Sequence, residues 1–149
     1  MGLRLKNLQF KSLKIPKKYL ILAILLPFLY LVFVLSFVWW HCYFSQFTGG
    51  KNGPLDAYRH TLASAVVAYT SSPKVVSLVT VVMERKGQQA NLMDKHNNAI
   101  GAKIDKNATT FNALKPAVML SISQGAINAT QATQITWLPQ QYWGESLFW

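Results

Sequence analysis

The stretch from Tyr19 to Trp40 contains no charged residue, and nearly all of its side chains are apolar. As an α-helix it is roughly 33 Å long, enough to cross the hydrocarbon core of a bilayer. Pro27 fits this prediction because membrane helices tolerate a kinking proline. A buried core helix is the alternative, but apolar residues on every face over this length argue against it. We therefore predict a transmembrane helix over residues 19–40.

The residues that flank this stretch predict its orientation. Residues 1–18 hold six of the fifteen basic residues and no acidic residue. The positive-inside rule then predicts a single-pass protein with a cytoplasmic N-terminus and with its C-terminal domain outside. The apolar run is longer than that of a signal peptide and no small-residue cleavage site follows it, so we expect an uncleaved signal anchor. Nucleic-acid binding by residues 1–18 is not expected, because the positive-inside rule already explains their charge.

The remaining sequence predicts a mainly α fold, with one N-terminal transmembrane helix plus a small soluble helical domain. Residues 1–18 form a basic cytoplasmic arm, residues 41–53 a glycine-containing linker, and residues 54–149 the helical outside domain with an aromatic C-terminal tail. Apolar spacing and breaker residues predict four helices in this domain. The second is rich in β-branched residues and also permits a buried strand, although we favour a helix. The four predicted helices span residues 54–69, 74–86, 89–104 and 111–123.

Two phrases of similar pattern lie in this domain, at residues 56–63 and 94–101. Each has an aspartate at its first position, polar residues three and four positions later, and a small residue seven positions later. On a helix these positions share one face. If the two helices pack by these faces, the polar side chains meet, and the small residues allow the helices to approach closely. The residues on the two faces are Asp56, Arg59, His60, Ala63, Asp94, Asn97, Asn98 and Gly101.

This set of side chains predicts a polar site with several open chemical interpretations. His60 beside Asp56 or Asp94 is a competent general base, because a carboxylate orients the imidazole and stabilises its charged form. Arg59 can hold a phosphate or an oxyanion. Alternatively, Asp56, His60, Glu84 and Asp94 bind a divalent metal, although no HExxH motif or cysteine pair supports this. The third interpretation is a paired network that only fixes the register of the helices.

The phrase D-A-Y-R-H at 56–60, a glutamate at 84 and the phrase M-D-K-H-N-N-A-I-G at 93–101 resemble a bacterial domain family of uncharacterised function. Members of that family often lie at the ends of large secreted or polymorphic-toxin-like proteins. The resemblance covers residues 53–138 and implies no particular reaction. The predicted membrane anchor departs from the usual setting of the family and argues against a free toxin. With the predicted orientation, the resemblance to bacterial domains implies a single-pass protein of the bacterial inner membrane whose C-terminal domain, residues 54–149, is periplasmic. The positions that match the family pattern are Asp56, Arg59, His60, Glu84, Asp94, His96, Asn97, Asn98 and Gly101.

Two functions follow as expectations. The first is a hydrolase-like activity at the membrane surface on a phosphorylated or envelope-derived substrate, with Asp56, Arg59, His60, Glu84 and Asp94 as catalytic residues. In this hypothesis Asn97, Asn98 and His96 bind the substrate, and the cofactor is unknown, with a divalent metal as a candidate. The second is a non-enzymatic subunit of an envelope assembly, such as a secretion or conjugation system. The expected partners are the lipid bilayer and either envelope proteins or further copies of the chain.

Overall fold

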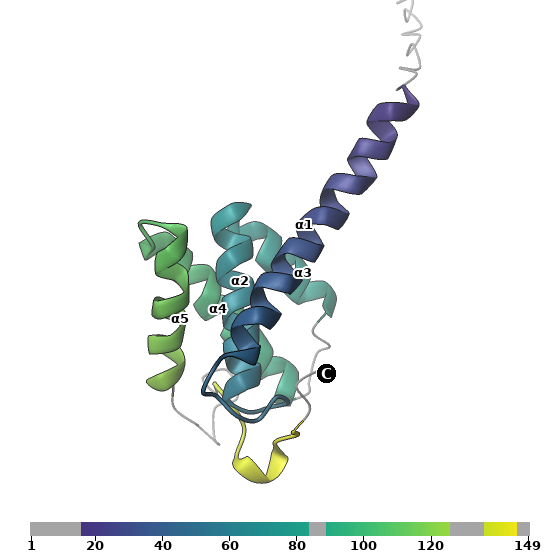
Figure 1. Cartoon of the computed structure of the whole chain (residues 1–149). Helices are drawn as coiled ribbons and strands as arrows, with labels where there is room; N and C mark the ends of the chain where they lie inside the picture. The colour runs from purple at the N-terminus through teal and green to yellow at the C-terminus, as the bar shows by residue number, and fades with distance from the viewer. Residues whose placement is uncertain (1–15, 84–88, 126–135, 146–149) are drawn as a thin grey trace, which may run out of the picture. The chain divides into compact units, whose positions relative to one another are not determined.

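The computed structural model describes residues 16–83, 89–125 and 136–145. The chain divides into two compact units, Met1–Val32 and Phe33–Trp149. The described residues are mostly helical and form no named strand, which confirms the predicted mainly α class. Figure 1 shows the order of the elements along the chain.

Helix α1 spans Lys17–Tyr43 and confirms the predicted long apolar helix. Pro27 lies inside it, and the side chains from Tyr19 to Leu29 are exposed on all sides. Among the described residues α1 alone is long and apolar enough to cross a membrane, by length and composition. Its first sixteen residues, 17–32, belong to the first unit, and the rest to the second.

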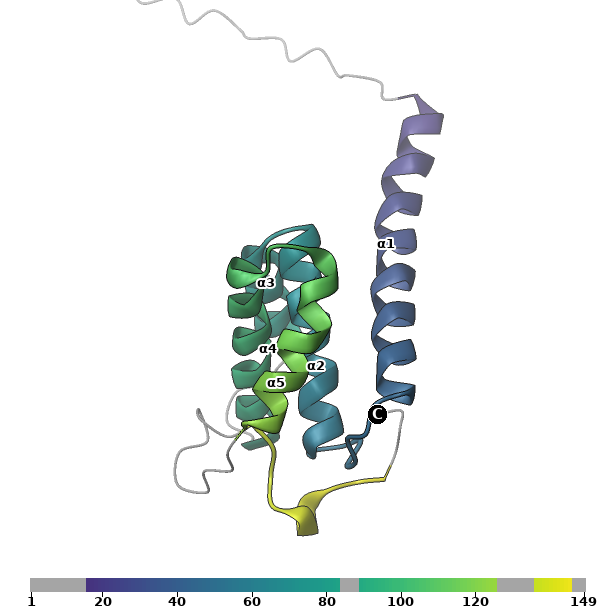
Figure 2. The ribbon, with the colours of Figure 1, turned by 60° about the vertical axis from the view of Figure 1, so that its left-hand side comes forward.

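The second unit contains four further α-helices: α2 (Pro54–Thr70), α3 (Pro73–Met83), α4 (Gln89–Asn107) and α5 (Leu114–Ser123). These agree with the four predicted helices, and the β-branched segment is a helix rather than a strand. Two short 3₁₀ turns, η1 (Phe111–Ala113) and η3 (Gln140–Tyr142), complete the described elements. In Figure 2 helices α2 to α5 lie side by side, and α2 packs against each of the other three.

Helix α2 forms the centre of the second unit because most of its length is apolar and buried. Tyr58, Leu62, Ala65 and Val66 are fully enclosed. Pro54 occupies the first helical position, where its missing N–H removes no hydrogen bond and its fixed φ suits a helix. The helix therefore starts at a residue that the sequence specifies well.

Helices α2 and α4 approach each other closely at Gly101. A Cβ atom at this position would lie 2.3 Å from the backbone oxygen of Thr61 and 2.8 Å from the Cβ of Ser64. No side chain fits there, so glycine is required for the contact. Because Asp94 lies beside Asp56 at one end of this contact and Gly101 beside Ser64 further along, the two helices are parallel. The two similar phrases therefore pack against each other in register, and the condition under which their polar side chains meet is fulfilled.

The boundary between the units lies closer to the N-terminus than the predicted end of the anchor at residue 40. Val34, Val38 and Cys42 recur every four residues on α1 and are buried within the second unit. Phe37 of α1 also contacts Phe111, with ring centroids 5.2 Å apart. The last turns of α1 thus form part of the second unit, because one face of this segment is apolar and has helices to pack against.

Residues 41–43 of the predicted linker form the end of α1, and residues 44–53 form a structured loop. Thr48 and Gly49 accept backbone hydrogen bonds from Leu55 and Asp56 at the start of α2. Gly49 has a φ of 74°, which glycine adopts without strain. These bonds satisfy N–H groups that the first turn of a helix leaves without partners, so the loop caps α2.

The described part of the aromatic tail, residues 136–145, packs across this loop. Lys51 and Gly144 form an antiparallel bridge, with N···O distances of 3.2 and 3.0 Å. Leu138 donates its backbone N–H to the carbonyl of Asn52 at 2.8 Å, and its side chain packs on Met93 of α4. The tail therefore ties the loop before α2 to α4.

Candidate functional site

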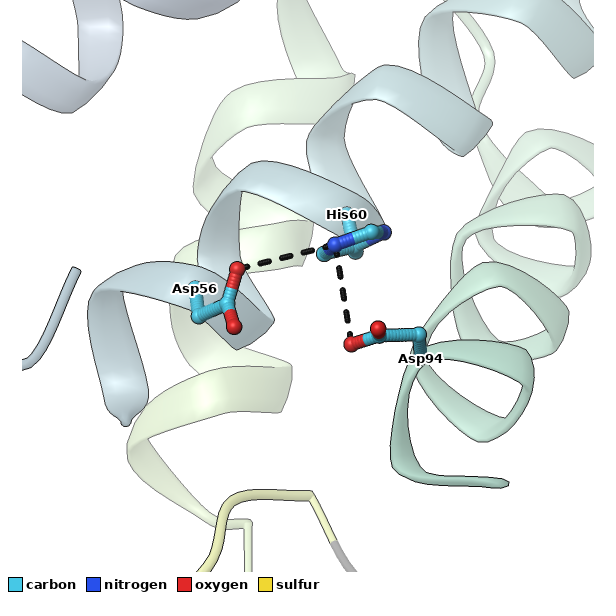
Figure 3. A group of neighbouring side chains, drawn as sticks. All are labelled: Asp56, His60 and Asp94. Atoms are coloured by element: carbon cyan, nitrogen blue, oxygen red, sulfur yellow. Dashed lines mark ion pairs between the residues drawn. The ribbon is translucent and has the colours of Figure 1, made fainter. Parts of the chain in front are cut away.

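Three side chains from α2 and α4 converge at one end of the contact between these helices (Figure 3). The Nε2 atom of His60 lies 3.5 Å from Oδ1 of Asp56 and 3.5 Å from Oδ1 of Asp94. The potential ligand atoms of the three residues all lie within 4.8 Å of one another. An imidazole between two carboxylates is well placed to carry a proton, because either carboxylate stabilises the charged form.

Asp56 is a firmly held carboxylate. Its Oδ2 accepts the backbone N–H of Asn52 at 2.6 Å, and its Oδ1 is paired with the guanidinium of Arg59. Asn52 has a φ of 60°, a left-handed conformation in which asparagine is enriched, and its side-chain amide donates to the carbonyl of Tyr142 at 3.1 Å. The tail thereby holds the loop that orients Asp56.

Asp94 is held much less completely. Its side chain is 15% exposed, and its buried Oδ1 makes no hydrogen bond with a described residue. The 3.5 Å separation from His60 is longer than a normal N–H···O hydrogen bond. Burial, reinforced by the negative charge of Asp56 and partly opposed by Arg59, raises the pKa of Asp94 to about 7. This carboxyl group therefore gains and loses a proton near neutral pH.

A buried carboxylate without hydrogen bonds requires a compensating positive charge. At this site a proton on Asp94, the charged form of His60 or a divalent cation can supply it. Carboxylate oxygens and an imidazole nitrogen are suitable ligands for such a cation. The Arg59 guanidinium already occupies the Asp56 oxygen that faces His60, and its positive charge opposes a second cation there.

The three residues line a cavity of about 570 Å³ within the second unit. Helices α1, α2, α3 and α4 all contribute to its wall. Its lining is mixed, with charged and amide side chains as well as many apolar ones. The polar lining residues are Lys51, Asn52, Asp56, Arg59, His60, Ser64, Thr80, Asn91, Asp94 and Asn98.

The two predicted asparagines have different surroundings in the structure. Asn98 lines the cavity but bridges three helices, since its Oδ1 accepts from Ser64 at 2.9 Å and its Nδ2 donates to Thr80 at 3.1 Å. Asn97 is not among the lining residues, and it donates to the carbonyl of Thr136 at 2.8 Å. The expectation that Asn97 faces the polar cluster is therefore corrected, because the tail engages its amide instead.

The remaining predicted residues differ in their placement. Arg59 lines the cavity beside Asp56 and His60. His96, which we predicted to bind the substrate, is not among the residues that line the cavity. Glu84 lies outside the described residues.

Sequence reasoning missed three parts of the cavity wall. Trp39 of α1 lies against Arg59, with the guanidinium carbon 5.4 Å from the ring centroid, a cation–π contact. Lys51 and Asn52 come from the loop that we predicted to be a linker. No local pattern marks these residues, because the turn of the loop and the packing of α1 bring them to the site.

Comparisons of the chain with protein-family models, with curated proteins and with solved structures find no match. The functional argument therefore depends on the geometry of the cavity and of the cluster on its wall.

Proposed function

We propose that this chain is a single-pass membrane protein whose second unit carries a hydrolase-type site for a phosphorylated or envelope-derived substrate. The observation that supports this function is the position of His60, 3.5 Å from each of two carboxylates on the wall of a cavity that Arg59 also lines. The similar bacterial domains name no reaction, so the proposal depends on these side chains.

The membrane location follows from α1 and its flanks. The apolar length of α1 and the basic residues before it favour a cytoplasmic N-terminus, and hence a second unit in the bacterial periplasm. Phe33–Tyr43 of α1 belongs to the second unit, so the site is built directly on the end of the anchor. A substrate at the membrane surface would then be within reach.

We assign different roles to the two aspartates. Asp56, held by Asn52 and Arg59, is the fixed anion that orients His60 and stabilises its charged form. Asp94, whose pKa is near 7, exchanges a proton with His60, so that the pair removes a proton from water and returns it to the leaving group. Arg59 carries the positive charge that faces an anionic substrate.

We favour this acid–base pair over a metal centre. Arg59 already pairs with Asp56, which is one of the three potential ligands of the described cluster. A metal ion would therefore have to share Asp56 with a guanidinium of the same charge. Activity that survives a chelator would agree with the acid–base pair, whereas activity that disappears and returns with a divalent cation would require a metal.

The test uses the full chain in detergent with three probes: 4-nitrophenyl phosphate, bis(4-nitrophenyl) phosphate, and vesicles of phosphatidylethanolamine and phosphatidylglycerol. We expect the wild type to hydrolyse at least one probe and His60→Ala to lose about 100-fold to 10,000-fold in rate with its melting temperature retained. His41→Ala is the matched control, because His41 does not line the cavity. Wild-type protein that cleaves none of the probes, or equal losses in both variants, would contradict the function.

A different observation favours a second candidate, a non-enzymatic subunit of an envelope assembly. The second unit exposes large apolar side chains on α3 and α5, among them Leu78 at 66%, Val81 at 75% and Leu120 at 57%. Exposed apolar groups of this kind are typical of surfaces that bind a partner. In that case the polar cluster would only stabilise the fold, and His60→Ala would lower the melting temperature markedly.

A further inference from the structure

The cavity contains an apolar region that the acid–base pair does not use. Six of its lining residues are aliphatic side chains from three helices, and they are not part of the His60 cluster. They are Val34, Leu35, Val38, Val67, Val76 and Val79. A water-soluble substrate would leave this part of the wall without a function.

Along α2 the residues that line the cavity change from charged to apolar. Along α2, Asp56 and Val67 both line it and are separated by about 16 Å at 1.5 Å per residue. Asn98, which bonds Ser64 and Thr80, marks the middle of this distance. The wall therefore changes from carboxylates and an imidazole at one end to valines at the other.

The lining residues of helix α1 also become apolar along the length of the cavity. Trp39 lies against Arg59 at the polar end, and Leu35 and Val34 follow about one turn further toward the N-terminus of the helix. The Trp39 ring thus contacts the polar end and lies about one helical turn from the first apolar residues of this wall. This position makes its fluorescence a reporter for a ligand that extends into the apolar end.

The charges at the polar end favour an anionic group. Lys51 and Arg59 supply two positive charges, whereas Asp56 supplies one negative charge. Asp94 is largely protonated, and so neutral, below pH 7. Arg59 lies on the same wall as His60, where it can face a phosphate next to the acid–base pair. The volume of about 570 Å³ is in the range of pockets that bind small molecules.

We propose that the cavity binds an amphiphile with one hydrocarbon chain and a phosphate head group. The chain lies along the valines and Leu35, and the phosphate lies at Arg59 and Lys51, beside His60. The proposal rests on the hydrolase-type function and names its substrate class. It also accounts for the participation of α1, since the apolar helix that anchors the protein supplies one wall of the chain-binding end.

The test measures binding rather than turnover, on the full chain in maltoside micelles. The probe is a lysophosphatidate whose single acyl chain carries two bromine atoms, which quench tryptophan fluorescence on contact. The difference in emission between the wild type and Trp39→Phe isolates the signal of Trp39. The same chain on a neutral glycerol head and glycerol 3-phosphate without a chain serve as comparison probes.

Val79 and Val81 provide a matched pair of variants. Both are exposed valines of α3, at 52% and 75%, but only Val79 lines the cavity. A carboxylate next to a hydrocarbon chain is unfavourable. We therefore expect Val79→Asp to require at least about tenfold more brominated lysophosphatidate for half-quenching of Trp39, and Val81→Asp to resemble the wild type.

The neutral glycerol lipid should quench Trp39 more weakly than the lysophosphatidate, and glycerol 3-phosphate should compete poorly. Equal quenching curves for Val79→Asp and Val81→Asp, or for the charged and neutral lipids, would overturn the proposal. The outcome is separable from that of the hydrolase test. Quenching without hydrolysis would support the amphiphile site and contradict the hydrolase-type function. Hydrolysis without quenching would support the hydrolase-type function and contradict the amphiphile site.

Discussion

Replacement of Asp94 by asparagine tests whether the cluster is a strained functional site or a stabilising network. In a paired network, loss of one charge leaves its partners unsatisfied and destabilises the fold. The structure leads to the opposite expectation for Asp94, because its buried oxygen has no hydrogen bond with a described residue and its pKa is raised to about 7. We therefore expect Asp94→Asn to stabilise the protein at alkaline pH.

The magnitude follows from the pKa. The pKa of Asp94 is near 7, whereas the ordinary value for an aspartate is 3.8. Each unit of difference in pKa corresponds to about 1.4 kcal/mol, so the ionised Asp94 lowers the free energy of unfolding by at most about 4 kcal/mol. Water that enters the cavity and the partial exposure of the side chain reduce this figure. We expect the free energy of unfolding of Asp94→Asn to exceed that of the wild type by about 1–3 kcal/mol above pH 7, which is about 3–9 °C in melting temperature.

The pH dependence has a definite sign. Between about pH 4 and pH 7 the folded protein keeps a proton on Asp94 that the unfolded chain has released, so the free energy of unfolding falls as pH rises. The asparagine variant lacks this proton. The difference in free energy of unfolding between Asp94→Asn and the wild type should be small near pH 4, grow up to about pH 7 and stay constant above it.

The assay is thermal unfolding of the full chain in detergent, followed by circular dichroism at half-unit steps of pH. Asp105→Asn is the matched control, because Asp105 lies on the same helix and does not line the cavity. An Asp94→Asn variant that melts below the wild type at pH 8, or a difference that does not change with pH, would refute the reasoning. The cluster would then be a structural network.

Four further expectations can be measured with the same preparations. Gly101→Ala should lower the free energy of unfolding by more than about 2 kcal/mol, because its Cβ would collide with the Thr61 carbonyl; retention of the wild-type melting temperature would contradict the close α2–α4 contact. Asn98→Ala should cost about 1–3 kcal/mol, since it breaks bonds to two other helices, and urea titration measures this loss. Arg59→Met should raise the pKa of Asp94 further and move the alkaline end of the stability profile above pH 7; an unchanged profile would show that Arg59 does not act on Asp94. Hydrolysis by the wild type should change through about pH 7, and Asp94→Asn should remove this inflection from the profile of kcat/KM against pH.

Local patterns in the chain were sufficient to predict its helices. The uncharged run predicts α1, Pro54 predicts the start of α2, and the matching phrases at 56–63 and 94–101 predict that two helices meet by their polar faces. The reason is that helical periodicity depends on residues three and four positions apart, which lie close in the sequence. The pairing of Asp56 with Arg59 and its approach to His60 are local in the same sense.

The sequence did not indicate which asparagine would face the cavity. Asn97 and Asn98 are adjacent and flank the direction of Asp94 on the two sides of the predicted face, yet Asn97 bonds Thr136 of the tail and Asn98 bonds Ser64 and Thr80. These partners are distant in the sequence. Their choice depends on how the tail and α3 pack, which no local periodicity encodes.

By itself the sequence determined the helical class, the long apolar helix and the composition of the polar cluster. The tertiary structure decided that the end of α1 joins the second unit, that the loop before α2 carries Asn52 to Asp56, and that one carboxylate is well bonded while the other is not. The two aspartates occupy equivalent places in their phrases, but among the described contacts Asp56 pairs with Arg59 and accepts a backbone N–H, whereas Oδ1 of Asp94 accepts no hydrogen bond. Burial and the negative charge of Asp56 raise the pKa of Asp94, and both depend on neighbours that only the fold brings together.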